Sequence, residues 1–375
     1  MMPVVLWTDA LIFLLTAVVV LFVLYARRKP HIRTPWQRVF SGRIAATSVV
    51  VLLAFIIIGL LDSLHFRLSL ADTGNSDETH YSVEVLSVLD VLLGPVKTQV
   101  EKTYSAPFAT HLFAKETIEL ADGTQVRDYP RLLYGGRHLP DDGAGKWRDI
   151  LQRSLLALLQ TFMTGAVIFY SAAVLLGRRA NRDSKSMLRA MLARQTLLPW
   201  RTMLTTVTLV VFLVLLVVNL AGAYHVFGTD KVGQDVLYLT LKSIRTGLVI
   251  GTLTTLIMLP FAIFLGIVAG YARGWTDDVV QYVYTTLNSI PGVLLIAASI
   301  LMLQVYITNH PENFETTVER ADIRLLFLCI ILGITSWTGL CRLLRGEALK
   351  LREAEYIQAA VSFGVAHGKI ITRHI

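Results

Sequence analysis

The sequence predicts an all-α polytopic membrane protein that carries a small α+β domain outside the bilayer. Two observations lead to this fold class. Hydrophobic residues make up 54% of the 375 residues and charged residues 17%, whereas soluble domains average roughly 45–50% and about 25%. The apolar residues are also gathered into runs of about 20, the length that a helix needs to cross a hydrocarbon core of roughly 30 Å.

Seven of these apolar runs predict membrane spans. They cover residues 4–25, 43–61, 155–176, 203–223, 248–271, 279–300 and 325–344. The first run is followed at once by Arg27, Arg28 and Lys29, whereas a cleaved signal peptide carries its positive charge before the apolar core. We therefore expect an uncleaved anchor with the N-terminus outside the cytoplasm of a bacterial inner membrane.

The basic residues lie in short loops that fall on one side when the spans alternate. The loop at 177–202 has one acidic residue, Asp183, against seven basic ones: Arg178, Arg179, Arg182, Lys185, Arg189, Arg194 and Arg201. A basic excess marks the cytoplasmic side, so this loop and residues 342–375 are predicted to be cytoplasmic. Because no single domain gathers the net charge of +8, we expect membrane lipid and not nucleic acid as a partner.

The acidic, polar segment at 62–153 is expected on the opposite, extracytoplasmic side. Within it, residues 81–100 have a mixed apolar pattern that predicts one or two helices. Residues 117–120 and 125–129 flank Asp122-Gly123, and Asp-Gly is a favoured tight turn between strands. We therefore expect a β-hairpin in a small domain of mixed structure.

Catalytic and metal-binding patterns are not found in the sequence. Cys329 and Cys341 lie in or at the end of one apolar run, where we expect small packing residues and not a disulfide or metal site. The nine histidines show no metal-ligand spacing. The segment 143–147 lacks the first Gly and the Ser or Thr of a phosphate-binding loop. We expect no enzyme activity, no cofactor and no ATP binding by this chain.

Three features near the later spans have structural explanations. Asp277 and Asp278 are expected to be solvated loop residues, with a proton or ion site as the alternative. Pro260 and Pro291 are expected to bend membrane helices, although a secondary transporter would use such positions for discontinuous helices. A ridge of small residues predicts a close helix–helix contact, and its members are Ala262, Gly266 and Gly270.

An amphipathic helix is predicted after the last span. Residues 346–364 are filled with strong helix formers and contain no proline. Tyr356, Ala360 and Phe363 should share one face, and Ala359 together with Ala360 should keep that surface shallow enough for a partner. A loop helix lying on the membrane surface is the alternative.

The end of this helix is also marked in the sequence. Gly364 is placed to end it in a left-handed conformation, and a second short helix should begin at Gly368. We therefore expect an L-shaped element.

This element resembles the EAA loop of ABC importer permeases. Glu355-Tyr-Ile-Gln-Ala-Ala-Val-Ser-Phe-Gly364, followed by Lys369-Ile-Ile-Thr-Arg-His-Ile375, is similar to the family pattern of Glu-Ala-Ala, three residues and Gly. Gln358 stands where the family has Glu. The family's Leu-Pro pair and two closing spans would follow, so we expect the coding sequence to continue past Ile375. The resemblance implies that a contact with an ATPase is made by Glu355, Tyr356, Gln358, Ala359, Ala360 and Gly364.

A second segment resembles dipeptide and oligopeptide permeases. Residues 227–236, Phe-Gly-Thr-Asp-Lys-Val-Gly-Gln-Asp-Val, are similar to the segment before the second core helix of that family. The matching positions are Gly228, Thr229, Asp230, Gly233 and Asp235. Residues 269–277, 289–291 and 337–346 are also similar to later parts of the family core.

The resemblance covers residues 227–375 and implies an incomplete type I ABC importer fold. Residues 203–375 would form the permease core, with the EAA loop at 346–375, and residues 1–202 an N-terminal extension. The implied function is ATP-driven import of a small solute of the peptide class. The implied partners are cytoplasmic ABC ATPase subunits, a second permease subunit and an extracytoplasmic solute-binding protein.

Two other function classes were weighed. A membrane sensor would use the segment at 62–153, but it needs a cytoplasmic signalling domain, and the loop at 177–202 is too short to be one. A secondary transporter predicts charged residues within the spans and an internal repeat, and we find neither. The substrate-lining residues are not identified by the sequence.

Overall fold

Membrane-spanning helices dominate the computed structural model, which describes residues 2–69, 81–119, 125–140, 143–179, 181, 183–193, 196, 198–314 and 316–374. Seven helices among these residues are long and apolar enough to cross a membrane. They are α1 (Trp7–Arg28), α3 (Arg43–Ser63), α6 (Lys146–Arg179), α8 (Trp200–Ala221), α9 (Val236–Ala272), α11 (Gly292–Asn309) and α12 (Thr317–Arg352). The prediction of a largely helical, multi-pass membrane protein with a small β-containing insert is confirmed.

The chain divides into two units, which are described separately. The first consists of Met1–Val4 and Thr16–Arg245, and the second of Val5–Leu15 and Thr246–Ile375. Helices α1 and α9 therefore contribute residues to both units. The domain boundary expected at 202–203 falls inside the first unit, and the division into extension and core stays a prediction.

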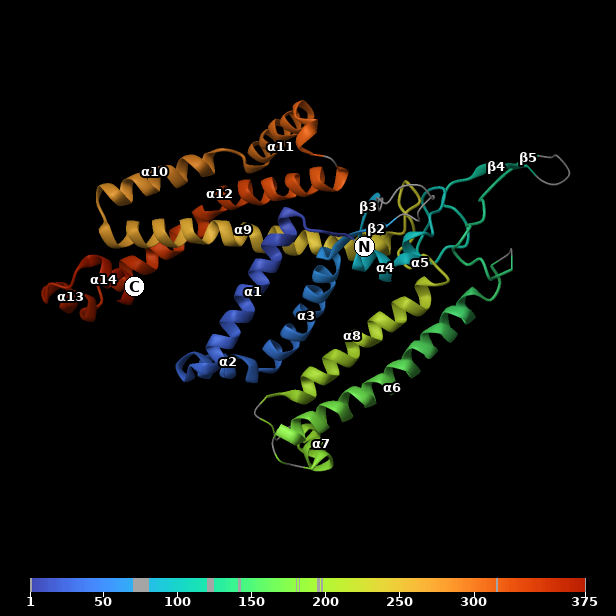
Figure 1. The fold of residues 1–375 in the computed structure, drawn as a ribbon, viewed down its shortest axis with the longest axis horizontal. Helices are drawn as coiled ribbons and strands as arrows, with labels where there is room; N and C mark the ends of the chain where they lie inside the picture. Colours follow the sequence, from blue (N-terminus) through green and yellow to red (C-terminus); the bar gives the residue numbers. More distant parts are fainter. Residues whose placement is uncertain are drawn as a thin grey trace, which may run out of the picture. The chain divides into compact units, whose positions relative to one another are not determined.

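In the first unit, α6 and α8 lie side by side and are joined at one end by α7 (Ser184–Leu192) (Figure 1). Helix α3 packs against α8. The short helix α2 (Pro30–Ser41) connects α1 to α3.

The segment between α3 and α6 contains the predicted mixture of helix and strand. Strands β1 (Met2–Val4), β2 (His65–Ser69) and β3 (Tyr81–Ser87) form an antiparallel sheet in the order β1-β2-β3. The helices predicted at 81–100 are confirmed only for α4 (Val88–Leu92) and α5 (Gly94–Lys97). The first seven residues of that range form β3 instead, because they pair with β2.

The predicted hairpin is present. Strand β4 (Glu116–Glu119) pairs antiparallel with β5 (Gln125–Asp128), and Glu116 lies opposite Asp128. The predicted turn, Asp122-Gly123, lies outside the described residues.

In the second unit, the predicted span at 279–300 is wrong. The chain instead forms α10 (Trp275–Ser289) and α11, separated by Ile290 and Pro291. Proline lacks the N–H that a helix interior needs and disfavours helical conformation in the residue before it. Ile290 is accordingly extended, and Pro291 is the N-cap of α11. Pro260, in contrast, lies inside α9 as expected.

Helix α12 follows the short 3-10 helix η1 (Pro311–Asn313) and packs closely on α9 through the predicted small-residue ridge. Ala262 is fully buried. A Cβ atom added to Gly266 would lie 2.8 Å from the Cys341 carbonyl oxygen, and one added to Gly270 would lie 2.6 Å from that of Arg345. These distances are too short for any side chain, so the predicted close contact is confirmed.

Both cysteines take part in such helix packing. Cys341 is buried in a cluster with Ala262, Ala269 and Trp337, and Cys329 is buried with Val249 and Leu253. The prediction that they are packing residues is confirmed.

Candidate functional site

The C-terminal element consists of two short helices that follow α12. Helix α12 ends at Arg352, and α13 (Glu355–Ser362) begins after a turn in which Ala354 is extended. The single helix predicted over 346–364 is therefore wrong, because its first two turns continue the long α12. Helix α14 (His367–His374) follows, so the predicted second short helix is present.

Gly364 ends α13 in the left-handed conformation that the sequence predicts. Its φ angle is +75°. The Gly364 N–H donates to the Val361 carbonyl at 2.9 Å, and the Val365 N–H donates to the Ala360 carbonyl at 3.1 Å. This pair of bonds is the Schellman arrangement. It turns the chain sharply into α14. A Cβ added at position 364 would meet nothing within 4 Å, so it is the positive φ angle that makes a β-branched residue there strained.

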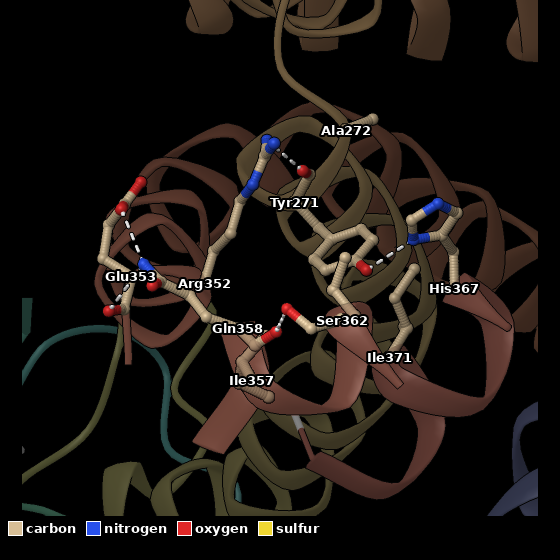
Figure 2. Close-up of a pocket in the computed structure, with 10 residues that line it drawn as sticks. Tyr271, Ala272, Arg352, Glu353, Ile357, Gln358, Ser362, His367 and Ile371 are labelled. Carbon is tan, nitrogen blue, oxygen red and sulfur yellow. Dashed lines mark hydrogen bonds between the residues drawn. The ribbon is translucent and has the colours of Figure 1, made fainter. Parts of the chain in front are cut away.

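Buried apolar residues hold the two short helices against the end of α9. Ile357 and Ile370 are fully buried and pack with Tyr271. The Tyr271 hydroxyl lies 2.7 Å from His367 Nδ1, and Arg352 donates to the Tyr271 carbonyl at 2.6 Å (Figure 2). The end of α9, the end of α12 and both short helices are thus tied together at one tyrosine.

The opposite face of α13 is exposed. Tyr356 is 52% exposed and Phe363 is 87% exposed, and Ala359 lies between them on the surface. Ala360 is not part of this face: it packs against the buried cluster of Tyr271, Ile357 and Ile370. The predicted placement of Ala360 on the exposed face is wrong, because the exposed row is formed by residues 356, 359 and 363 and Ala360 lies next to it. Its contact with an ATPase stays a prediction.

Two further predicted residues lie at the start and middle of α13. Glu355 is the first residue of the helix and is exposed, where a negative charge favours the helix dipole. Gln358, which replaces the family's Glu, donates to the Glu353 carbonyl at 3.3 Å. Neither residue is held in a buried network, so both remain accessible to a partner.

A cavity of about 730 Å³ opens beside this element. Figure 2 shows that it lies between the tyrosine-centred contacts and the inner side of α13, and its polar lining includes Arg352, Gln358, Ser362 and His367. Helix α13 is therefore packed along only part of its inner side. It is held to the rest of the unit through Ile357 and Ala360.

An ion pair fixes the start of α10 to α12. Asp277 accepts two hydrogen bonds from Arg345, at 2.5 and 2.6 Å. This guanidinium lowers the pKa of Asp277, against the opposing effect of burial. The expectation that Asp277 is solvated is wrong, since it is 8% exposed, whereas Asp278 is exposed as predicted.

The second predicted site, the motif segment at 227–236, belongs to the first unit and fits tightly against residues 101–105. A Cβ atom added to Gly233 would lie 1.8 Å from the Glu101 carbonyl oxygen, and one added to Gly228 would lie 2.2 Å from that of Ser105. Both glycines also have φ angles near +80°. Only glycine fits these two positions.

The polar motif residues form hydrogen bonds that hold the same segment in its conformation. Asp230 accepts hydrogen bonds from the N–H groups of Val232 and Gln234 at 2.9 and 2.8 Å. The Thr229 hydroxyl donates to the Thr103 carbonyl at 2.7 Å. These motif residues thus shape the segment or attach it to the N-terminal half of the chain.

A buried histidine between two carboxylates joins the motif segment to Glu101. Nδ1 of His225 lies 2.7 Å from Asp235, and Nε2 lies 3.2 Å from Glu101. The three side chains are 0–2% exposed. Burial opposes protonation of His225, but the hydrogen bonds to Asp235 and Glu101 outweigh it and raise its pKa to about 9. The imidazole is therefore a cation at neutral pH and neutralises part of the two buried negative charges.

Glu101, His225 and Asp235 form an ionic triad, and its two carboxylates also accept hydrogen bonds from the backbone. Glu101 also accepts hydrogen bonds from the backbone N–H groups of Leu133, Tyr134 and Gly135. Burial raises the pKa of Glu101, but these bonds and the one from His225 lower it overall. Asp235 accepts from the N–H of Leu237 at 2.7 Å and so caps α9. Sequence reasoning identified Asp235 but missed Glu101 and His225.

A second buried polar cluster links the first unit's α3 and α4 to the beginning of α9. Lys242 lies 2.8 Å from Asp90 and 3.2 Å from Asp62. The Tyr238 hydroxyl donates to Asp90 at 2.7 Å. Burial opposes ionisation of Asp90, yet Lys242 and the further hydrogen bonds lower its pKa to about 2. The motif segment and the first turns of α9 are therefore held by two ionic clusters.

Comparison with known proteins bears on the C-terminal part of the chain. Residues 262–375 match the family described as "Binding-protein-dependent transport system inner membrane component". This range contains α10 to α14 and the end of α9. The resemblance that the sequence predicts is confirmed for these residues.

Individual relatives agree with that match. The chain is 30% identical over 154 residues to the oligopeptide transport system permease protein OppC of Mycobacterium tuberculosis, which covers 41% of this chain and 47% of that protein. OppC of Haemophilus influenzae is 32% identical over 152 residues, with 40% and 43% covered. The dipeptide transport system permease protein DppC of Bacillus subtilis is 27% identical over 154 residues, with 41% and 42% covered. The chain thus spans less than half of the length of each of these relatives.

Proposed function

We propose that this chain, whose residues 262–375 form a binding-protein-dependent transport system inner membrane domain, is a permease subunit of an ATP-driven importer. The proposal rests on the structure of the C-terminal element, α13 and α14. Its exposed helix α13 is fixed by a left-handed glycine at one end and by a long membrane helix at the other. The named relatives are oligopeptide and dipeptide permeases, which supports peptides as the solute class.

In the proposed mechanism, movement enters the membrane domain through α13. ATPase subunits bind the surface formed by Tyr356, Ala359 and Phe363 on the cytoplasmic side. Because Arg352 and His367 both bind Tyr271, a displacement of α13 is transmitted to the ends of α9 and α12 together. Coupling requires an element whose position differs between two states, and a short helix packed on part of one side suits this role.

The solute would cross between the membrane helices of this chain and of a second permease subunit. An extracytoplasmic solute-binding protein would deliver it at the face that carries residues 62–153 and 227–236. The basic loop at 177–202 supports a cytoplasmic location for the other face, with the N-terminus outside.

For the N-terminal extension we propose a bracing role. Glu101 and Asp90 come from the extension, and each forms a buried ionic cluster with residues at the start of α9 or just before it. The extension would hold the motif segment in place while the membrane helices move.

Transport by the reconstituted complex tests the proposed function. The chain would be co-expressed with its ATPase, second permease and binding-protein partners, and uptake of a labelled peptide would be measured in proteoliposomes. Gly364→Val should abolish ATP-dependent uptake at an unchanged membrane level, since a β-branched residue at φ +75° costs about 1–3 kcal/mol and distorts the turn.

The matched control is Gly368→Val, because Gly368 lies in α14 without positive φ, and an added Cβ would touch nothing within 4 Å. This variant should transport normally. Full uptake by the Gly364→Val protein would refute the coupling role, and uptake that does not require the chain at all would refute the permease function.

A further inference from the structure

A small polar cavity in the first unit lies where α2 and α3 meet the loop before α8. Its volume is about 170 Å³, and its polar lining is Ser41, Arg43, Thr196, Trp200, Arg201 and Thr202. Since one water occupies roughly 30 Å³ of liquid, the cavity has room for a group of several heavy atoms. None of these residues belongs to the C-terminal element or to the two ionic clusters.

Among the described residues that line this cavity, the two charged ones are both positive. Arg43 and Arg201 are both exposed, and within the described residues neither forms an ion pair with a carboxylate. The sequence contains no Asp or Glu between residues 27 and 61, nor between residues 184 and 229. The Thr202 hydroxyl adds a further donor, whereas that of Ser41 already donates to the Arg38 carbonyl at 2.7 Å. Such a lining suits an anion that accepts several hydrogen bonds.

Two helix N-termini at the cavity also favour a bound anion. Helix α3 begins at Arg43 and α8 at Trp200, and both starting residues line the cavity. Their N-cap residues, Gly42 and Pro199, provide no side-chain cap. The Trp200 N–H already donates to the Leu198 carbonyl at 2.8 Å. The other N–H groups of each first turn carry a partial positive charge that favours a bound anion.

Helix α2, next to the cavity, has the composition of a helix that lies on a membrane surface. Trp36 and Phe40 stack with ring centroids 5.7 Å apart, and no residue of α2 is buried. Trp36 is 48% and Val39 is 54% exposed. Arg33 and Arg38 lie on the same short helix. An exposed aromatic face beside basic residues is typical of helices at the interface of anionic bilayers.

We propose that this cavity binds the phosphate headgroup of an anionic phospholipid, with the aromatic face of α2 lying against the acyl chains. The occupant is a lipid because the cavity adjoins α2, an amphipathic helix between two membrane spans that carries aromatic residues beside basic ones. Trp36 and Phe40 lie outside the cavity lining, on the adjoining helix, where they offer acyl chains an apolar surface that a free anion would not cover. Arg43 and Arg201 would bind the phosphate oxygens, and the two helix N-termini would add their N–H groups.

Native mass spectrometry of the full chain in detergent tests the proposal. The purified protein would be titrated with phosphatidylglycerol, phosphatidylethanolamine or inorganic phosphate. We expect bound phosphatidylglycerol to be preferred over phosphatidylethanolamine, and inorganic phosphate not to displace it. The double variant Arg43→Gln, Arg201→Gln should bind phosphatidylglycerol at least about tenfold more weakly, and Arg43→Lys, Arg201→Lys should recover part of the loss.

The control removes the same charge from the same part of the unit. Lys185 and Arg189 are exposed on α7 and do not line the cavity, so Lys185→Gln, Arg189→Gln should bind phosphatidylglycerol as the unchanged protein does. Equal losses in the two double variants would overturn the proposal, because they would indicate unspecific attraction. Displacement by millimolar inorganic phosphate would overturn the lipid as the occupant.

Discussion

Raising the pH should loosen the motif segment by discharging His225. The imidazole is fully buried between Asp235 at 2.7 Å and Glu101 at 3.2 Å. These carboxylates raise its pKa from 6.5 to about 9. Since a tenfold change in proton affinity is worth about 1.4 kcal/mol, this rise corresponds to about 3 kcal/mol of stability in favour of the folded segment.

Because folding raises the pKa of His225, the stability that it contributes decreases as the pH rises. A group whose pKa is raised by folding stabilises the folded state fully below its unfolded pKa, near 6.5. That contribution declines as the pH rises and is lost above about 9. The contribution of His225 to the stability of the segment should therefore be largest below pH 6.5 and smallest above pH 9.

Hydrogen exchange measured by mass spectrometry provides the assay. The N–H groups of Leu133, Tyr134 and Gly135 donate to Glu101, so their protection reports directly on the triad. Their protection factors, corrected for the intrinsic effect of pH on exchange, should fall on the order of 100-fold between pH 6.5 and 9.5. His225→Gln should lower protection at pH 6.5 and remove most of this pH dependence.

His138 provides a matched control. It also contacts a carboxylate, Asp149 at 2.9 Å, but its side chain is 37% exposed. The His138→Gln protein should retain the pH dependence of residues 133–135. Protection factors that stay constant from pH 6.5 to 9.5 in the unchanged protein would refute the role given to His225.

Two further predictions concern close packing and an ion pair. Gly233→Ala should lower the free energy of unfolding of the detergent-solubilised protein by at least about 1–3 kcal/mol, because its Cβ would lie 1.8 Å from the Glu101 carbonyl oxygen. Gly247→Ala is the control, since a Cβ at that position meets nothing within 4 Å. Equal stabilities of the two variants would contradict the contact. Asp277→Asn and Arg345→Gln should destabilise the second unit non-additively in a double-mutant cycle. Because Arg345 lowers the pKa of Asp277, the pair's contribution should be present at neutral pH and decline on acidification below the usual carboxyl range; additive effects would argue against the pair.

The parts of the fold that depend on local sequence could be predicted. Run length located six of the seven spanning helices, and the Asp-Gly pair located the hairpin of β4 and β5. The left-handed conformation of Gly364 followed from the helix that it ends. The break at Pro291 was missed because a proline inside a membrane helix is compatible with both a bend and an end, and only packing decides between them.

The contacts between distant segments could not be predicted. Glu101 is 124 residues from His225, and nothing near it in the sequence indicates a partner. Asp277 was expected in solvent because its partner Arg345 lies on another helix, 68 residues away. Ala360 was assigned to the exposed face because spacing alone allows either of two adjacent rows on a short helix.

Site-directed cross-linking tests the central claim most directly, namely that α13 is the surface bound by an ATPase. Both native cysteines would first be replaced, by Cys329→Ala and Cys341→Ala. In this background, Ala359→Cys places a thiol on the exposed face of α13. The control, Glu312→Cys, places a thiol at an exposed position on the opposite side of the membrane in the proposed topology. Membranes containing the co-expressed transporter would be treated with a short bifunctional reagent, with and without ATP. We predict that Ala359→Cys gives a cross-link to an ATPase subunit whose yield changes with ATP, while Glu312→Cys gives none. An intact complex in which Ala359→Cys never cross-links, or in which Glu312→Cys cross-links equally well, would contradict the account.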